Sequence, residues 1–249
     1  MSTRNVRVPE NLITALHNAQ SVAGLTGSGV SAESGVPTFR EAQTGLWARF
    51  DPVELATPEA FARDPRLVWE WYAWRRKHID RAAPNRGHEA LAELERSLSS
   101  FALITQNVDG LHLKAGSQNV VELHGNIRRS KCSREGVIVE PRKGDAGVPP
   151  LCPRCGAFLR PDVVWFGEAL PVDALAEAFE AARGCDLFLC VGTSGLVQPA
   201  ASLPFEALRN GAVVVEVNPH ETPLTQYASY VLRGRAGEML PALAKAAYG

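Results

Sequence analysis

The chain has 249 residues and 45% of them are hydrophobic, which is enough for one large α/β domain with an insertion or for two unequal domains. Its 26 basic and 27 acidic residues give a net charge of −1, which argues against binding to nucleic acid or to an anionic membrane surface. No apolar run has the length of a signal peptide or a membrane span, and five cysteines with one Cys-x-x-Cys fit a reducing compartment. We therefore expect a soluble cytoplasmic protein.

The N-terminal part predicts a helix, a strand and a glycine-rich turn. Residues 11–20 carry apolar side chains at helical spacing, and residues 21–25 form a short apolar run typical of a buried strand. Gly27 and Gly29 then allow a sharp turn and a close approach of a ligand to the backbone. Free N–H groups at such a turn could bind a phosphate, although an ordinary strand-to-helix turn has the same pattern. Hydroxyl donors near this turn are Ser28, Ser31 and Ser34.

After this turn, Pro37 prevents a regular helix from continuing, and the loop ends in Phe39 and Arg40. An aromatic ring and a guanidinium suit a ligand that carries both a flat ring and phosphates. Residues 41–83 are rich in aromatic and charged residues, which predicts a small helical insertion. The prolines that mark turns or helix starts in this insertion are Pro52, Pro58 and Pro65.

The rest of the chain alternates between helices and strands, apart from one stretch. Residues 85–96 predict a helix and residues 101–105 a buried strand, whereas residues 125–160 contain Gly, Pro and Cys with little apolar periodicity. The alternation predicts a doubly wound parallel, Rossmann-like sheet. Residues 1–40, 84–124 and 161–249 would form this domain, and the insertions 41–83 and 125–160 a smaller one.

Polar residues follow three of the predicted strands. Because ligands bind at the carboxyl ends of the strands in an open parallel sheet, these residues should converge with the Gly27 turn. Each alone could equally be a turn or a helix cap. The spacing does not match Gly-x-Gly-x-x-Gly, which disfavours a hydride-transferring dehydrogenase. The residues are Gln106, Asn107, Asp109, Gly192, Thr193, Ser194 and Asn218.

His124 follows a strand-like run and precedes Gly125, which could leave room for a substrate. A neutral imidazole can take a proton near pH 7, so His124 is a candidate general base, while a packed or capping histidine is the alternative. Cys185 and Cys190 lie in an apolar run and are most simply core residues.

Together the blocks 27–40, 105–109, 123–126, 191–194 and 217–219 resemble the sirtuins, the NAD-dependent lysine deacylases. The resemblance implies that NAD is consumed and that the acyl group passes to ADP-ribose, giving nicotinamide, O-acyl-ADP-ribose and free lysine. It makes His124 the base, assisted by Asn107, and it implies that His112 holds a loop near the site. The implied NAD-binding residues are Gly27, Ser28, Gly29, Ser31, Glu33, Phe39, Arg40, Gln106, Asn107, Asp109, Gly192, Thr193, Ser194, Asn218 and Ala236.

The Cys152-Pro-Arg-Cys155 sequence has the spacing of a zinc-ribbon knuckle, and Cys132 lies in the same insertion. Sirtuins commonly bind a structural zinc ion with four cysteines. In this sequence the first knuckle reads Cys132-Ser-Arg-Glu135, so Glu135 or a water molecule completes the tetrahedron, or the site is empty.

Tyr72 and Arg75 are spaced i and i+3, so on a helix they share one face and could grip a carboxylate together. The alternative is a solvated arginine beside a packed tyrosine. A Tyr-x-x-Arg at this place resembles the class III sirtuins, which remove succinyl and malonyl groups. The resemblance also implies that Val164 and Phe166 line the acyl-lysine channel, beside a substrate peptide bound as an added strand.

We therefore expect an NAD-dependent protein-lysine deacylase that prefers acidic acyl groups and also removes acetyl groups. Its partners would be acyl-lysine proteins or peptides, without nucleic acid or membrane. The alternatives are a mono-ADP-ribosyltransferase that uses the same cleft and a catalytically silent NAD-sensing module. Intact His124 and Asn107 argue against the silent module, because a pure binder needs neither.

Overall fold

The structure is a computed structural model that describes residues 7–36, 51–142, 144 and 147–249. Its centre is a six-stranded sheet in the order β3-β2-β1-β6-β7-β8, with every neighbouring pair parallel. This confirms the predicted doubly wound sheet. The strands are β1 (Val22–Thr26), β2 (Phe101–Thr105), β3 (Val120–Glu122), β6 (Leu187–Val191), β7 (Val213–Val217) and β8 (Tyr230–Leu232).

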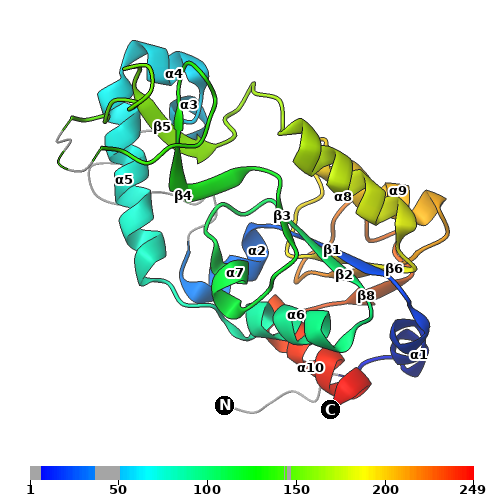
Figure 1. The fold of residues 1–249 in the computed structure, drawn as a ribbon. Helices are drawn as coiled ribbons and strands as arrows, with labels where there is room; N and C mark the ends of the chain where they lie inside the picture. Colours follow the sequence, from blue (N-terminus) through cyan, green and yellow to red (C-terminus); the bar gives the residue numbers. More distant parts are fainter. Residues whose placement is uncertain (1–6, 37–50, 143, 145–146) are drawn as a thin grey trace.

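Helices cover both faces of this sheet, because alternate strand residues point to opposite sides and both sides are apolar. In β6, for example, Leu187 and Leu189 pack on one face while Phe188 and Cys190 pack on the other. Helices α6 and α10 lie below the sheet in Figure 1, and α8 and α9 lie above it. The bounds are α1 (Glu10–Asn18), α6 (Arg86–Ser97), α8 (Val172–Gly184), α9 (Leu203–Arg209) and α10 (Ala236–Tyr248).

A smaller helical unit stands apart from the sheet (Figure 1). Its helices α3 (Pro52–Leu55), α4 (Pro58–Arg63) and α5 (Pro65–Arg81) each begin at a proline, as predicted. Proline suits the first turn because its missing N–H would have no intrahelical acceptor there, and Thr57 and Asp64 cap the α4 and α5 N-termini with side-chain oxygens.

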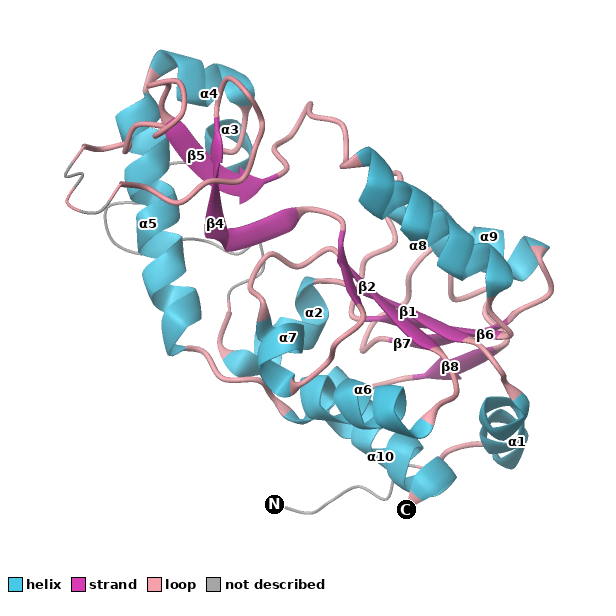
Figure 2. Ribbon diagram, in the orientation of Figure 1, coloured by secondary structure: helices cyan, strands magenta, loops and turns pink. Residues whose placement is uncertain are grey.

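The second insertion is more regular than its composition predicts. It opens with β4 (Gly125–Cys132), which pairs antiparallel with β5 (Leu159–Val163) as a separate two-stranded sheet beside α5 (Figure 2). Ile127 of β4 packs with the helical insertion in one apolar cluster, so the first strand belongs to a core although its sequence shows little apolar periodicity. A register shift between Asn126 and Ser130 and several charged residues hide the strand pattern in the sequence. The domain boundaries given above stay a prediction.

In the described part of the chain, no helix is both long and apolar enough to span a membrane.

Candidate active site

The glycine-rich turn after β1 forms α2 (Ser28–Ser31) and a short 3-10 turn that Gly35 ends with a φ of +74°. Gly27 and Gly29 approach the loop after β6 closely. The Gly29 N–H donates to Gly192 O at 2.8 Å, and a Cβ on Gly29 would lie 2.7 Å from that oxygen. The Gly27 N–H donates to Val191 O at 3.1 Å. The expected free N–H groups are therefore used at both positions, and the glycines serve contact between two loops.

Thr193 joins the loops that follow three strands. The Gln106 Nε2 donates to Thr193 Oγ1 at 3.0 Å, and the Asn218 Nδ2 donates to the Thr193 carbonyl oxygen at 2.8 Å. The loops after β2, β6 and β7 thus meet the turn after β1, as the parallel order of the strands predicts. Ser194 is exposed next to this junction. Their role in NAD binding stays a prediction.

Ser31 is the centre of a buried hydrogen-bond network. Its hydroxyl donates to Asp109 Oδ2 at 2.7 Å, and it accepts from Asn107 Nδ2 at 3.1 Å. His88 Nδ1 accepts from the Asn85 N–H, so the proton of its neutral ring lies on Nε2, which contacts Ser31 Oγ at 3.2 Å. The hydroxyl therefore makes three hydrogen bonds, and it fixes two candidate site residues.

Asn107 and Asp109 are held by further bonds. The second amide hydrogen of Asn107 goes to Gly27 O at 3.1 Å, so both donors of the amide are used and its oxygen is left to accept. The Asp109 Oδ1 accepts from the Leu111 N–H at 2.9 Å. Both side chains are buried, and bonds of this kind hold them in a single orientation.

Two histidines, His88 and His112, lie next to Ser31 and Thr26. Sequence analysis did not identify His88 as part of the site. Both are fully buried with ring centroids 4.9 Å apart, and His112 Nε2 lies 2.9 Å from Thr26 Oγ1. Burial lowers the pKa of His88 to about 4 and that of His112 to about 3, so both rings are neutral near pH 7. The pattern Asn85-Arg-Gly-His88 was the available signal, because it forms a capping box at the start of α6.

His124 lies between β3 and β4 with its ring already oriented. Its Nδ1 lies 2.9 Å from the Gln106 carbonyl oxygen, and because a carbonyl only accepts, Nδ1 carries the proton. Nε2 of the neutral ring therefore keeps its lone pair, and burial lowers the pKa of His124, which favours this neutral form. This arrangement suits a general base.

The backbone requires a glycine at position 125. Its φ is +77°, and a Cβ there would lie 2.2 Å from the Asp162 carbonyl oxygen, because β4 starts against β5 at this point. This close pairing of two strands requires a glycine, and the expectation that Gly125 also leaves room for a substrate stays a prediction. The predicted peptide-binding segment is adjacent, since the Val164 N–H donates to the His124 carbonyl oxygen at 3.0 Å.

Glu33 and Ala236 meet at the start of α10. The Glu33 Oε2 accepts from the Gly237 N–H at 2.8 Å, so its carboxylate lies in the first turn of that helix, and Ala236 is buried beside it. This gives Glu33 a structural role next to the predicted cofactor role. Ser28 is exposed at the first position of α2. Phe39 and Arg40 lie outside the described residues.

Tyr72 and Arg75 lie on α5, as predicted. Tyr72 is 1% exposed, and its hydroxyl oxygen accepts from Trp165 Nε1 at 3.0 Å, which leaves the hydroxyl hydrogen to donate. Burial raises the pKa of Tyr72 to about 12, so that hydrogen is retained near pH 7. Arg75 is half-buried, with its guanidinium carbon 5.2 Å from the Trp71 ring centroid. Phe166 is 45% exposed on the neighbouring segment.

Cys132, Cys152 and Cys155 come together beside β4 and β5. Their sulfur atoms lie within 4.8 Å of one another, and all three are free thiols. Two sulfurs on one tetrahedral zinc ion are about 3.8 Å apart, because each Zn–S bond is about 2.3 Å long, and the sulfurs of Cys132 and Cys155 are 3.4 Å apart. The cluster could therefore hold zinc. Cys185 and Cys190 lie in the core, as predicted.

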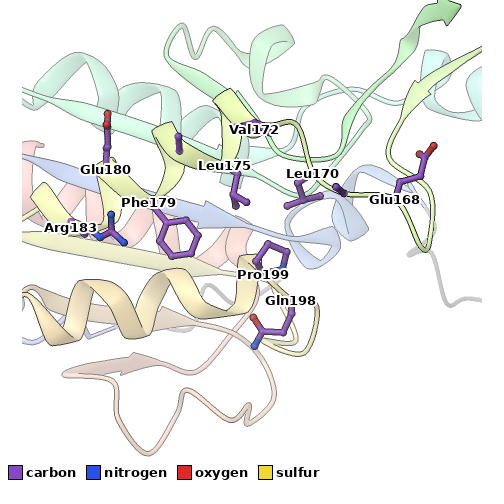
Figure 3. A pocket seen from close by; sticks show the side chains of 11 residues that line it. Glu168, Leu170, Val172, Leu175, Phe179, Glu180, Arg183, Gln198 and Pro199 are labelled. Carbon is purple, nitrogen blue, oxygen red and sulfur yellow. The ribbon is translucent and has the colours of Figure 1, made fainter. Parts of the chain in front are cut away.

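A surface cavity of about 660 Å³ lies between α8, residues 168–170 before it, and Gln198 and Pro199 after β6 (Figure 3). Its wall is mostly apolar, with Leu170, Leu175, Phe179 and Pro199 pointing toward its centre. None of the predicted cofactor, substrate or metal residues lines it, so it lies outside the candidate active site.

The sequence comparisons agree with this geometry. A sequence model of the Sir2 family matches residues 27–199, which contain most of the candidate site. The chain belongs to the Sir2 family. A relative from Aquifex aeolicus, named NAD-dependent protein deacylase, is 55% identical over 217 residues, covering 87% of this chain and 90% of that protein. One from Pseudomonas aeruginosa, NAD-dependent protein deacylase 1, is 51% identical over 245 residues, covering 95% and 98%.

Solved Sir2 structures have the same fold. A crystal structure of a Sir2 homologue in complex with NAD superposes with a TM-score of 0.89 at 48% identity, covering 98% of this chain and 95% of that one. A Sir2 structure with a p53 peptide and NAD⁺ superposes with a TM-score of 0.83 at 32% identity, covering 95% and 97%. These neighbours bind NAD, and one of them binds a peptide as well.

Proposed function

We propose that this Sir2 family member is an NAD-dependent protein-lysine deacylase. The observation that carries the proposal is His124, whose ring is neutral, fixed by Gln106 O and free to accept a proton at Nε2. Val164 of the segment proposed to pair with substrate peptide is hydrogen-bonded to the same residue. The deacylases that this chain resembles support this assignment.

The polar loops supply the NAD-binding residues of the proposal. NAD, when bound, supplies the ADP-ribose that accepts the acyl group. Gln106, Asn107 and Asp109 would orient its nicotinamide ribose. Both amide hydrogens of Asn107 are used within the protein, so its amide oxygen would accept a hydrogen bond from a donor of the cofactor. His124 Nε2 would take a proton from a ribose hydroxyl, which makes that oxygen a better nucleophile. The five free thiols fit the cytoplasm, where we place the reaction.

The test is nicotinamide release from NAD with and without an acyl-lysine peptide. A deacylase releases nicotinamide only with the peptide and transfers the acyl group to ADP-ribose. Label from NAD that appears covalently on the peptide or protein would indicate the alternative, mono-ADP-ribosyl transfer. NAD binding without any release under either condition would indicate a silent NAD-binding module and would contradict the proposal.

We further propose that the enzyme prefers succinyl and malonyl groups and also removes acetyl groups. Burying an unpaired carboxylate would cost several kcal/mol, roughly 3–5 in known cases. The Tyr72 hydroxyl keeps a hydrogen to donate, and the Arg75 guanidinium on the same helix supplies charge. An acetyl group ends in a methyl, which offers this pair no acceptor.

Matched succinyl- and acetyl-lysine peptides test the preference. We expect Arg75→Met to lower kcat/KM for the succinyl peptide by roughly 30- to 1,000-fold, equivalent to about 2–4 kcal/mol, and to spare the acetyl peptide. Tyr72→Phe should act in the same direction with a smaller effect, because it removes one neutral donor. Equal losses on both peptides would mean that the two residues only shape the channel.

A further inference from the structure

The cysteine cluster is built from two turns of the same shape. In the first turn the Gly136 N–H donates to Cys132 O at 3.0 Å, and in the second the Gly156 N–H donates to Cys152 O at 2.9 Å. Both glycines have positive φ, +70° and +73°. Glu135 therefore occupies in the first turn the place that Cys155 occupies in the second.

Glu135 keeps the backbone role of that position. Its N–H points at the Cys132 sulfur at 3.4 Å, as expected of a turn that surrounds a thiolate. Its side chain, however, does not join the cluster of sulfur atoms. Among the described residues, the group of possible ligand atoms within 4.8 Å of one another consists of the three sulfurs, without a carboxylate. The Glu135 Oε2 instead accepts from Arg154 Nε at 2.9 Å.

Chain length explains why the carboxylate does not simply replace a thiol. A glutamate carries its oxygens two bonds further from Cβ than a cysteine carries its sulfur, so a turn that positions a sulfur for a metal places a carboxylate past it. The side of the cluster next to Glu135 is open to water, because residues 133–138 are exposed while Cys132 and Cys152 are buried.

We propose that the cluster holds zinc through three thiolates and leaves the fourth coordination position to an exchangeable ligand from solvent, such as water or a small thiol. Glu135 and Arg154 form the rim of this position and do not coordinate. A tetrahedral zinc with three protein ligands and one open position binds external ligands, whereas four protein ligands close the site. An incoming thiol would give its proton to the buffer, bind as thiolate and displace the water, which returns to solvent. The proposal does not depend on the deacylase activity.

The full-length protein loaded with Co²⁺ tests this directly, because charge transfer from sulfur to cobalt reports the number of bound thiolates. We expect a monothiol such as 2-mercaptoethanol to raise that absorbance saturably in the parent protein. Glu135→Gln should respond in the same way, and so should the charge control Glu140→Gln, which lies in the same insertion. Glu135→Cys should start at the higher absorbance and should not respond.

Zinc release to a chelator provides the second readout. We expect Glu135→Cys to slow release about tenfold or more, while Glu135→Gln and Arg154→Met stay close to the parent. Release that is about tenfold faster from Glu135→Gln, with a changed cobalt spectrum, would show that Glu135 coordinates and would overturn the proposal. A parent protein that binds neither metal, or whose cobalt spectrum ignores the thiol, would overturn it as well.

Discussion

The loops after β1, β2, β6 and β7 are held together by hydrogen bonds between polar groups, whereas the region of α5 that faces β5 is held together by aromatic packing. In the first region the Ser31 hydroxyl bonds to both Asn107 and Asp109. In the second, Trp165 lies with its ring centroid 5.3 Å from Phe61 and 6.4 Å from Tyr72. The Trp165 indole N–H also donates a hydrogen bond to the Tyr72 hydroxyl.

This difference determines how each region should respond to a change. In a saturated polar network, removing one partner leaves others buried without a hydrogen bond, so an effect spreads to neighbouring residues. In an aromatic cluster the loss is mainly one of volume and contact area, and it stays near the substituted ring. His124 lies between the two regions, bonded to Gln106 on one side and to Val164 on the other.

The largest expected effect is on His124 itself. His124→Ala should lower acyl-lysine-dependent turnover about 100-fold or more, because the general base is lost. NAD affinity should survive, since the imidazole contacts the polar loops through the Gln106 carbonyl oxygen, while the side chains of Gln106 and Asn107 are held by other hydrogen bonds. His124→Tyr should behave in the same way. Steady-state kinetics with calorimetric NAD titration measures both quantities, and turnover within a few-fold of the parent would remove His124 from the catalytic role.

Gly29→Ala should give the next largest effect, on the polar loops. The added Cβ would meet backbone atoms of Gly192 at 2.7 and 2.8 Å, which cannot rotate away. We expect the free energy of unfolding to fall by about 3 kcal/mol, at the upper end of the range for overpacked sites, because the contacted atoms are backbone. Gly184→Ala is the matched control, because a Cβ there meets nothing within 4 Å. Urea unfolding compares the two, and equal stabilities would mean that the loops adjust freely.

The contact between Gly29 and Gly192 also shows how much of the structure the sequence predicts. Residues 101–105 form a strand with the predicted bounds because five consecutive residues suit a buried strand, and the α5 start follows from Pro65. The parallel order then brings the strand ends together. Neither the approach of Gly29 to Gly192 nor the bond between His88 and Ser31, 57 positions apart, has a local sequence signal, because both are set by how distant loops pack.

The two regions should also lose stability at opposite ends of the pH scale. His88 and His112 are neutral when folded, with pKa values of about 4 and about 3, but they bind protons below about 6.5 when unfolded. The unfolded chain therefore binds more protons as the pH falls from 6.5 toward 4, and stability decreases. Asp109 opposes this by favouring the charged form of His88.

Tyr72 has the opposite behaviour, because its folded pKa is raised to about 12. Its contribution is present below about pH 10 and is lost as the pH rises toward 12. We expect a loss of about 3 kcal/mol for each of the two histidines by pH 4 and of about 1 kcal/mol for Tyr72 by pH 11. Urea midpoints across pH 4–11 measure this. His88→Gln should reduce the acidic slope only, by about half because His112 remains, and Tyr72→Phe should flatten the alkaline slope only. One variant that changes both slopes would contradict the separation.

The smallest expected effect is at Glu33, which lies at the edge of the polar loops. Its carboxylate accepts from the Gly237 N–H in the first turn of α10, where a negative charge also interacts favourably with the helix dipole. Glu33→Ala should lower the free energy of unfolding by about 1 kcal/mol, and Glu33→Gln by less, because the amide oxygen can still accept. Urea unfolding and NAD titration should be run on both variants. If NAD affinity follows stability, weakening for Ala and not for Gln, Glu33 acts on the cofactor site through α10. If Gln weakens NAD binding as much as Ala while stability is kept, the carboxylate touches NAD directly.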